Sequence, residues 1–197
     1  MTTRVIISGL LGGIVMFIWT SIAHMFLPLG EIGIKEIPNE TSVLGSLQDN
    51  IRGRTGLYVF PGLGLGENAG KQERNEAMKH LSEKYASKPS GILMYHPPGR
   101  PFEIGRRLGI EFGTEFAEAL LAVFLLAQTA IGSFLGRVTF VFVAGILAAV
   151  ATNVSYWNWY GFPARYTAAY MFIQIVGFLL VGIVAAMMLG KRQTQTA

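Results

Sequence analysis

The stretch Leu108–Ile131, with the sequence LGIEFGTEFAEALLAVFLLAQTAI, decides the fold of this chain. It is an apolar run long enough to cross a membrane as a helix, and its first half carries Glu111, Glu115 and Glu118. At about 100° per residue, the three side chains fall within ~60° of arc on one helical face. Because an ionisable group at membrane depth costs roughly 2.5–3.5 kcal/mol, this face should turn toward a bundle interior, a water-filled cavity or a partner.

The composition of the chain supports a membrane protein. Of the 197 residues, 51% are hydrophobic and 14% are charged, and the mean hydropathy is +0.43. Most charged residues lie between Gly30 and Arg107, and no basic stripe interleaved with aromatic residues is present, so nucleic acid is not a predicted partner. The absence of cysteine excludes disulfides, thiolate metal sites, iron–sulfur clusters and c-type haem attachment.

Four apolar segments predict a mainly α, polytopic membrane protein with a four-helix transmembrane bundle. The first helix is expected within residues 1–29, and its run Val5–Leu29 is too long for the apolar region of a cleaved signal peptide. Residues 108–190 supply helices two to four, as Leu108–Ile131, Val138–Val154 and Tyr166–Leu189. Residues 191–197 form a polar tail. An aromatic-rich stretch, Tyr156–Tyr166, is typical of an interfacial belt between the last two helices.

Residues 30–107 predict a small α/β cap inserted between the first and second membrane helices. A helix is expected from Asn39 or Thr41 to about Gln48, and a second over Ala69–Ser87 that Asn68 caps. Short β-prone runs are expected at residues 56–61 and 91–96, each closed by proline. Because two strands alone are marginally stable, the cap should lean on the membrane helices or on a partner.

The distribution of basic residues predicts the orientation in the membrane. Leaving the long cap aside, one side carries Arg165 and the other carries Arg4, Arg137, Lys191 and Arg192. Both termini are therefore expected in the cytoplasm and the cap outside it, in a bacterial inner membrane. The arginines next to the second helix, Arg100, Arg106 and Arg107, favour the opposite orientation.

A candidate polar site follows from this layout. Four crossings bring six residues to the membrane level of the cap: His24, Glu111, Glu115, Glu118, Asn153 and Arg165. Glu118 lies ~10 Å further into the membrane than Glu111, so it should depend most on a partner. Two interpretations stay open. The carboxylates are either neutralised by the arginines at positions 106, 107 and 165, or they form a functional site for a cation, a proton relay or a head group.

No motif in the sequence identifies a reaction, a metal site or a cofactor. Gly64-x-Gly66-x-x-Ala69 follows a strand and opens a helix, but two strands are too few for a dinucleotide-binding fold. His80 and His96 have no second ligand at metal spacing, and the HExxH, GxSxG, Walker and Glu-x-x-His patterns are absent from the sequence. The cofactor is unknown on this basis, and no metal is predicted.

Two functions remain compatible with the sequence. The first is a non-catalytic accessory or structural subunit of a larger membrane complex, because its small-residue stripes permit close helix packing with other subunits or with a second copy. These stripes are Gly9/Gly13, Ala144/Ala148/Thr152 and Gly177/Gly182. The second is a small membrane enzyme or carrier that uses the carboxylates and His24. Lacking a catalytic motif, the chain is not predicted to be an enzyme.

Overall fold

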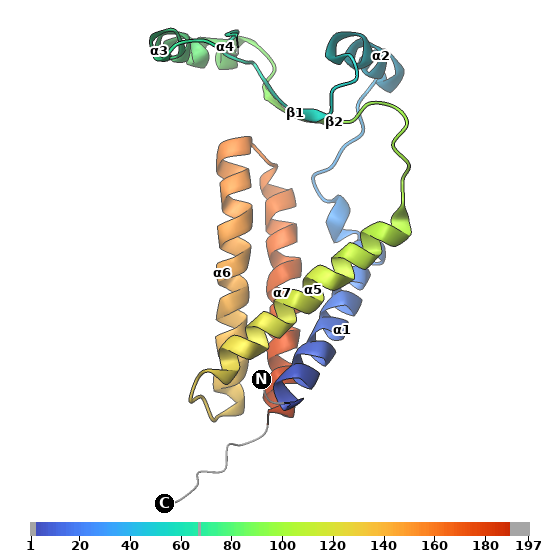
Figure 1. Cartoon of the computed structure of the whole chain (residues 1–197), viewed down its shortest axis with the longest axis vertical. Helices are drawn as coiled ribbons and strands as arrows, with labels where there is room; N and C mark the ends of the chain where they lie inside the picture. The colour runs from blue at the N-terminus through green and yellow to red at the C-terminus, as the bar shows by residue number, and fades with distance from the viewer. Residues whose placement is uncertain (1–2, 67, 190–197) are drawn as a thin grey trace, which may run out of the picture. The chain divides into compact units, whose positions relative to one another are not determined.

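The computed structural model describes residues 3–66 and 68–189, which are mainly helical (Figure 1). They fall into two compact units, each described by itself below. The helical unit comprises the N-terminal segment up to Ile34 together with the segment that begins at Glu103. The cap unit is Lys35–Phe102. The sequence predicts the cap over residues 30–107, so the structural unit is shorter at both ends.

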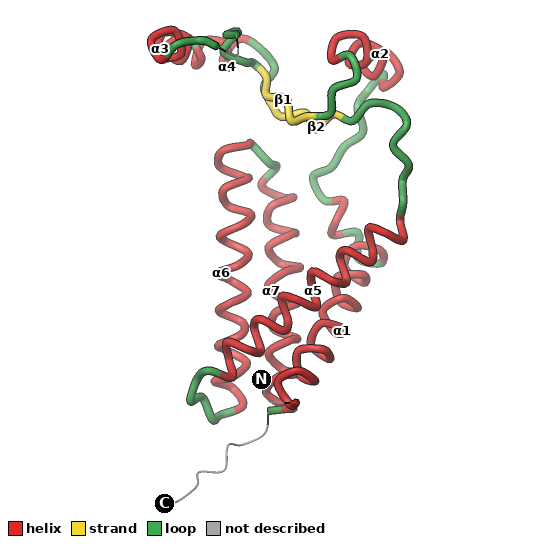
Figure 2. Tube along the Cα trace, in the orientation of Figure 1, coloured by secondary structure: helices red, strands yellow, loops and turns green. Residues whose placement is uncertain are grey.

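Four long helices form the helical unit: α1 Thr3–Met25, α5 Ile104–Ala127, α6 Phe134–Tyr160 and α7 Ala164–Met188 (Figures 1 and 2). Helix α1 packs against both α5 and α7, and α6 packs mainly against α7. Among the described residues, α1, α6 and α7 are long and apolar enough to cross a membrane, which is consistent with an integral membrane location. Helix α5 carries too many charged residues to count as a candidate membrane span by length and composition, so the predicted four-span bundle is not confirmed.

Small residues allow the helices of this unit to approach closely. A methyl group added at Gly13 of α1 would lie 2.9 Å from the Cα of Phe116 on α5, and Gly9 also faces α5. A methyl group at Gly182 of α7 would lie 3.1 Å from the carbonyl oxygen of Val138 on α6. The core between the helices contains Val5, Met16, Ala119, Ala122, Val123, Leu126, Val141, Phe178, Val181 and Ala185.

The ends of the helices differ from the predicted ones for local reasons. Helix α1 stops at Met25 instead of Leu29, because Pro28 has no N–H to continue the hydrogen-bond ladder. The short 3-10 helix η1 (Leu29–Glu31) then turns the chain. Helix α5 begins at Ile104, one turn before the predicted start, and ends at Ala127.

Helix α6 is much longer than the predicted Val138–Val154. It begins at Phe134, where the backbone N–H of Gly136 donates to the Ser133 hydroxyl at 3.1 Å. It ends at Tyr160, before Gly161 adopts a left-handed conformation with φ of 70°. The aromatic stretch expected between the last two helices is therefore largely helical, and only residues 161–163 separate α6 from α7.

The cap unit contains the predicted two-stranded sheet. Strands β1 (Gly56–Phe60) and β2 (Gly91–Tyr95) pair antiparallel, with residue 56 opposite 95 and residue 60 opposite 91. Helix α2 (Glu40–Ile51) precedes β1. This antiparallel pairing differs from the parallel sheet of a dinucleotide-binding fold. Tyr95 is the one buried side chain among the described residues of the cap unit.

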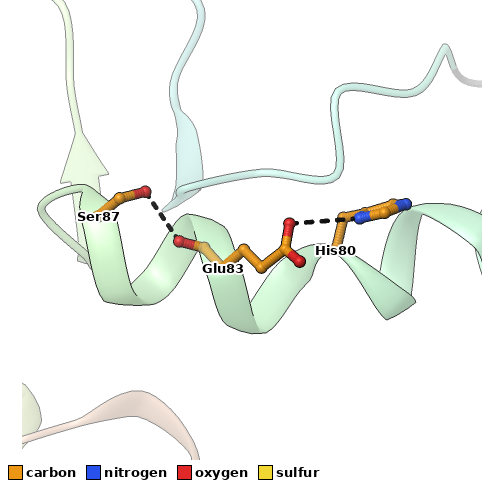
Figure 3. A network of polar contacts seen from close by, with 3 residues as sticks. All are labelled: His80, Glu83 and Ser87. Atoms are coloured by element: carbon orange, nitrogen blue, oxygen red, sulfur yellow. Dashed lines mark hydrogen bonds and ion pairs between the residues drawn. The ribbon is translucent and has the colours of Figure 1, made fainter.

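The single helix predicted over Ala69–Ser87 is divided in two at His80. Helix α3 covers Lys71–Lys79 and α4 covers Leu81–Ser87. Figure 3 shows the exposed contacts after the break: His80 Nδ1 lies 3.4 Å from Glu83 Oε2, and the Ser87 hydroxyl donates to the Glu83 carbonyl at 2.8 Å. The predicted Asn68 cap is wrong, because the helix begins after Gly70, whose N–H donates to the side chain of Glu73 at 3.0 Å.

Candidate functional site

A polar cavity of about 220 Å³ lies in the helical unit, and all four long helices contribute to its wall. Five of the six predicted site residues line it: His24, Glu111, Glu115, Glu118 and Asn153. The other lining residues are Met16, Thr20, Thr114, Thr152, Tyr170, Ile173 and Gln174. The helical spacing of the glutamates thus places them on one wall, as the sequence predicts.

Glu115 is the most buried of the three carboxylates. Its side chain is 4% exposed, and its Oε2 has no hydrogen-bond partner among the described residues. Thr20 of α1 lies beside the Glu115 carboxyl group. Glu118 is only partly buried and Glu111 is exposed, so burial does not increase steadily with depth along the helix. The reason is the close crossing of α1 and α5, which covers the turn that carries Glu115. The sequence analysis instead expects Glu118, the deepest of the three, to depend most on a partner.

His24 is held in a defined orientation at the end of α1. Its Nδ1 lies 3.0 Å from the backbone carbonyl of Thr20, and a carbonyl only accepts, so Nδ1 carries the proton. In the neutral ring, Nε2 is then the acceptor. The ring of Tyr170 meets His24 edge to face at a centroid distance of 5.7 Å. Gly30 packs directly against the imidazole, and a side chain at position 30 would displace the ring.

An amide pair lies on the α6 and α7 side of the cavity. Asn153 Nδ2 donates to the carbonyl of Ala149 at 3.0 Å and approaches Gln174 Oε1 at 3.5 Å. Gln174 is a site residue that the sequence analysis missed. The available signal was its position four residues after Tyr170, which places both on one face of α7. Thr20 and Thr152 gave no such signal, because threonine is common in apolar helices.

Arg165 does not join the cavity. It is exposed in the first turn of α7, away from the lining residues. Among the described residues, none of the three glutamates forms an ion pair, and Arg106 instead lies 3.8 Å from Glu103. Arg106 is thus paired with a glutamate outside the cavity. Among the residues with described positions, neither lysine nor arginine lines the cavity.

The cavity offers oxygen ligands that are spread apart. Carboxylate, hydroxyl and amide groups come from four helices, but within the described residues no three His, Cys, Asp or Glu side chains converge closely enough to hold a metal ion. The volume is several times the ~30 Å³ that one water occupies in the liquid. The arrangement therefore suits a hydrated or organic cation rather than a bare ion held by three carboxylates.

Comparison with models of protein families, with curated proteins and with solved structures finds no match to this chain.

Proposed function

We propose that this chain is an integral membrane protein that binds a small cation in its polar cavity and acts as a carrier. One observation carries the proposal. Among the described residues, Glu115 is 4% exposed, has an oxygen without a hydrogen-bond partner and shares its cavity with two further carboxylates, and His24 is the one basic side chain in the wall. Burying a carboxyl oxygen that has no hydrogen-bond partner is unfavourable for folding, so the presence of this oxygen favours a role in binding.

The ligand class follows from the charge and size of the cavity. Three carboxylates give it an excess of negative potential, which attracts a cation and excludes anions. Hydroxyl and amide oxygens from Tyr170 and Gln174 supply further acceptors. A monovalent ion with part of its water shell, or a small organic ammonium ion, satisfies this lining. The features that support the proposal are those of binding.

The membrane arrangement is part of the proposal. We infer that α5 is the fourth span, because its carboxylates line the cavity while Leu121, Phe124 and Leu125 stay exposed as a lipid-facing surface requires. The excess of basic residues near the termini favours cytoplasmic termini and an extracytoplasmic cap, in a bacterial inner membrane. Reporter fusions at Ala197 and within residues 68–75 test this orientation, and cytoplasmic activity from the second fusion would contradict it.

The accessory-subunit hypothesis stays a prediction, but its main argument is weaker. Gly9 and Gly13 pack against α5, and Gly177 and Gly182 pack against α1 and α6, so two of the three small-residue stripes are used within the chain. The third stripe, on α6, is partly exposed. A second polypeptide that stays bound to the purified protein in native mass measurements would support the accessory role.

A cation titration of the purified full chain tests the proposed function. The probes are Na⁺, K⁺ and tetramethylammonium, added separately to protein in mild detergent at constant ionic strength. A bound cation should raise the unfolding temperature, since binding at a hundredfold excess over Kd contributes about 2.7 kcal/mol. Glu115→Gln should abolish the shift, because it removes the buried charge.

Glu103→Gln is the matched control. Glu103 precedes the same helix, but it does not line the cavity and lies near an exposed arginine. Its variant should keep the full cation response. The proposal is wrong if none of the three cations shifts the unfolding temperature, or if both variants respond like the parent chain.

A further inference from the structure

A second cavity lies at the other end of the helical unit. Its volume is about 510 Å³, and it shares no lining residue with the polar cavity. The start of α1, the end of α5, the start of α6 and the end of α7 surround it. It therefore forms an independent candidate for ligand binding at the end of the bundle where α1 begins and α7 ends.

The charge of this second cavity is opposite to that of the first. Arg4 and Arg137 line it, and no acidic residue does among the residues that the structure describes. Arg137 is only 6% exposed, and its Nε donates to the backbone carbonyl of Ile131 at 3.0 Å, which fixes the guanidinium at the wall. Arginine has a planar guanidinium group whose donors match the geometry of a phosphate group, so Arg137 places a suitable positive charge at the cavity wall.

The remaining wall is partly polar and partly apolar. Gln128 and Thr129 add an amide and a hydroxyl beside the arginines. The Thr129 hydroxyl donates to the Leu126 carbonyl at 2.8 Å, so the turn after α5 is held by its own side chain. The apolar part of the wall consists of Val5, Phe124, Leu126, Ala127, Ile131 and Leu189. A free phosphate ion gains nothing from contact with this apolar surface, whereas an acyl chain is stabilised by burial against it.

We propose that this second cavity binds the phosphate group of an anionic phospholipid, with Arg137 and Arg4 as the phosphate ligands. Basic pockets between membrane helices bind anionic head groups through this combination of arginine and apolar wall. The residues involved belong to neither the polar cavity nor the cap unit, so the inference does not depend on the proposed cation site. With cytoplasmic termini, the lipid would come from the inner leaflet, where anionic head groups attract basic residues.

Lipid retention tests this proposal directly. The full chain is purified in mild detergent, phosphatidylglycerol or phosphatidylcholine is added in increasing amounts, and native mass spectra give the fraction of protein that carries a lipid. Phosphatidylglycerol should be retained at lower concentration than phosphatidylcholine. Arg4→Gln should weaken this retention by about tenfold, since it removes one charge-assisted contact, and Arg137→Gln should weaken it further.

Two controls keep the test decisive. Arg165→Gln changes an exposed arginine outside the cavity and should retain phosphatidylglycerol like the parent chain. Arg137→Lys keeps the charge if Arg137→Gln fails to fold, and it should bind more weakly than the parent because an ammonium group lacks the planar fork. Inorganic phosphate forms a further arm and should displace the lipid only weakly.

Three outcomes would overturn the proposal. Equal retention of the two lipids by the parent chain would remove the anionic preference. Unchanged phosphatidylglycerol retention in Arg4→Gln together with either Arg137 variant would place the lipid elsewhere. Inorganic phosphate that binds as tightly as the lipid, and displaces it, would make the cavity a free-phosphate site.

Discussion

The helical unit and the cap unit differ most in how much of each is buried. All four long helices contribute side chains to the core of the helical unit, whereas Tyr95 is the one buried side chain among the described residues of the cap. A two-stranded sheet is marginally stable in water. Packing therefore determines the shape of the helical unit, while the described cap depends mainly on local hydrogen bonds and turns.

The largest expected effect is a disruption of the helical unit at Gly13. A methyl group there would lie 2.9 Å from the backbone of Phe116, so Gly13→Leu must push α1 and α5 apart. We expect the free energy of unfolding to fall by about 3 kcal/mol, the upper end for overpacking. Gly113→Leu is the matched control, because among the described residues no atom outside the neighbouring helix backbone lies within 4 Å of a Cβ added there. Thermal unfolding in detergent that finds the two variants equally stable would contradict the α1–α5 contact.

The next effect should be confined to the cap. Tyr95→Ala removes its buried side chain and should cost the cap roughly 2–3 kcal/mol, the low end for a change from a large residue to alanine. Hydrogen exchange should accelerate over both strands and stay unchanged in the long helices. Tyr95→Phe should behave like the parent, since the Tyr95 hydroxyl has no hydrogen-bond partner among the described residues. Faster exchange throughout the chain would show that the two units unfold together.

A smaller effect, of opposite sign, is expected at Glu115. Glu115→Met replaces a buried carboxyl group that has an unpartnered oxygen, so it should raise the free energy of unfolding by about 1–2 kcal/mol. The measurement is thermal unfolding in a buffer without added Na⁺, K⁺ or ammonium ions. Glu103→Met, at an exposed position, should change stability little. A destabilised Glu115→Met chain would mean that the carboxyl group holds the helical unit together instead of serving a ligand.

The smallest effect is expected at the start of α3. Glu73→Ala removes the acceptor of the Gly70 N–H and should cost about 0.5–1 kcal/mol, measured as faster exchange in the first turn of that helix alone. Glu76→Ala is a suitable comparison, because its ion pair with Lys79 is solvent-exposed and such pairs contribute little. Equal changes in the two variants would argue against the capping role.

Periodicity and composition predict much of the helical unit. The apolar runs correspond to the long helices, and the spacing of Glu111, Glu115 and Glu118 places all three in one cavity. The sequence could not show which of them is most buried, because burial depends on where α1 crosses α5. Arg165 illustrates the same limit: the sequence places it near the start of the last helix, but the direction of its side chain depends on how α7 is turned against its neighbours.

The exact ends of the helices, and the side chains that meet only when separate helices pack, were harder to predict. The hydrophobic pattern of α6 ends near Val154, but aromatic residues also fit a helix, so the left-handed Gly161 sets the true end. Gln174 enters the cavity only because α6 and α7 bring it next to Asn153. The break at His80 falls within a run of good helix formers, and no residue type in that run signals it.

The length of α6 has a consequence for how the protein sits in lipid. Its 27 residues measure ~40 Å at 1.5 Å per residue, whereas the hydrocarbon layer is ~30 Å thick. In the proposed orientation, the final turns, which carry the exposed Tyr156, Trp157, Trp159 and Tyr160, extend into the head-group layer as a rigid rod. In this orientation, a change in bilayer thickness that tilts α6 would also tilt α7, because the two helices pack along each other, and hydrophobic mismatch would thereby reach the Tyr170 and Gln174 wall of the polar cavity.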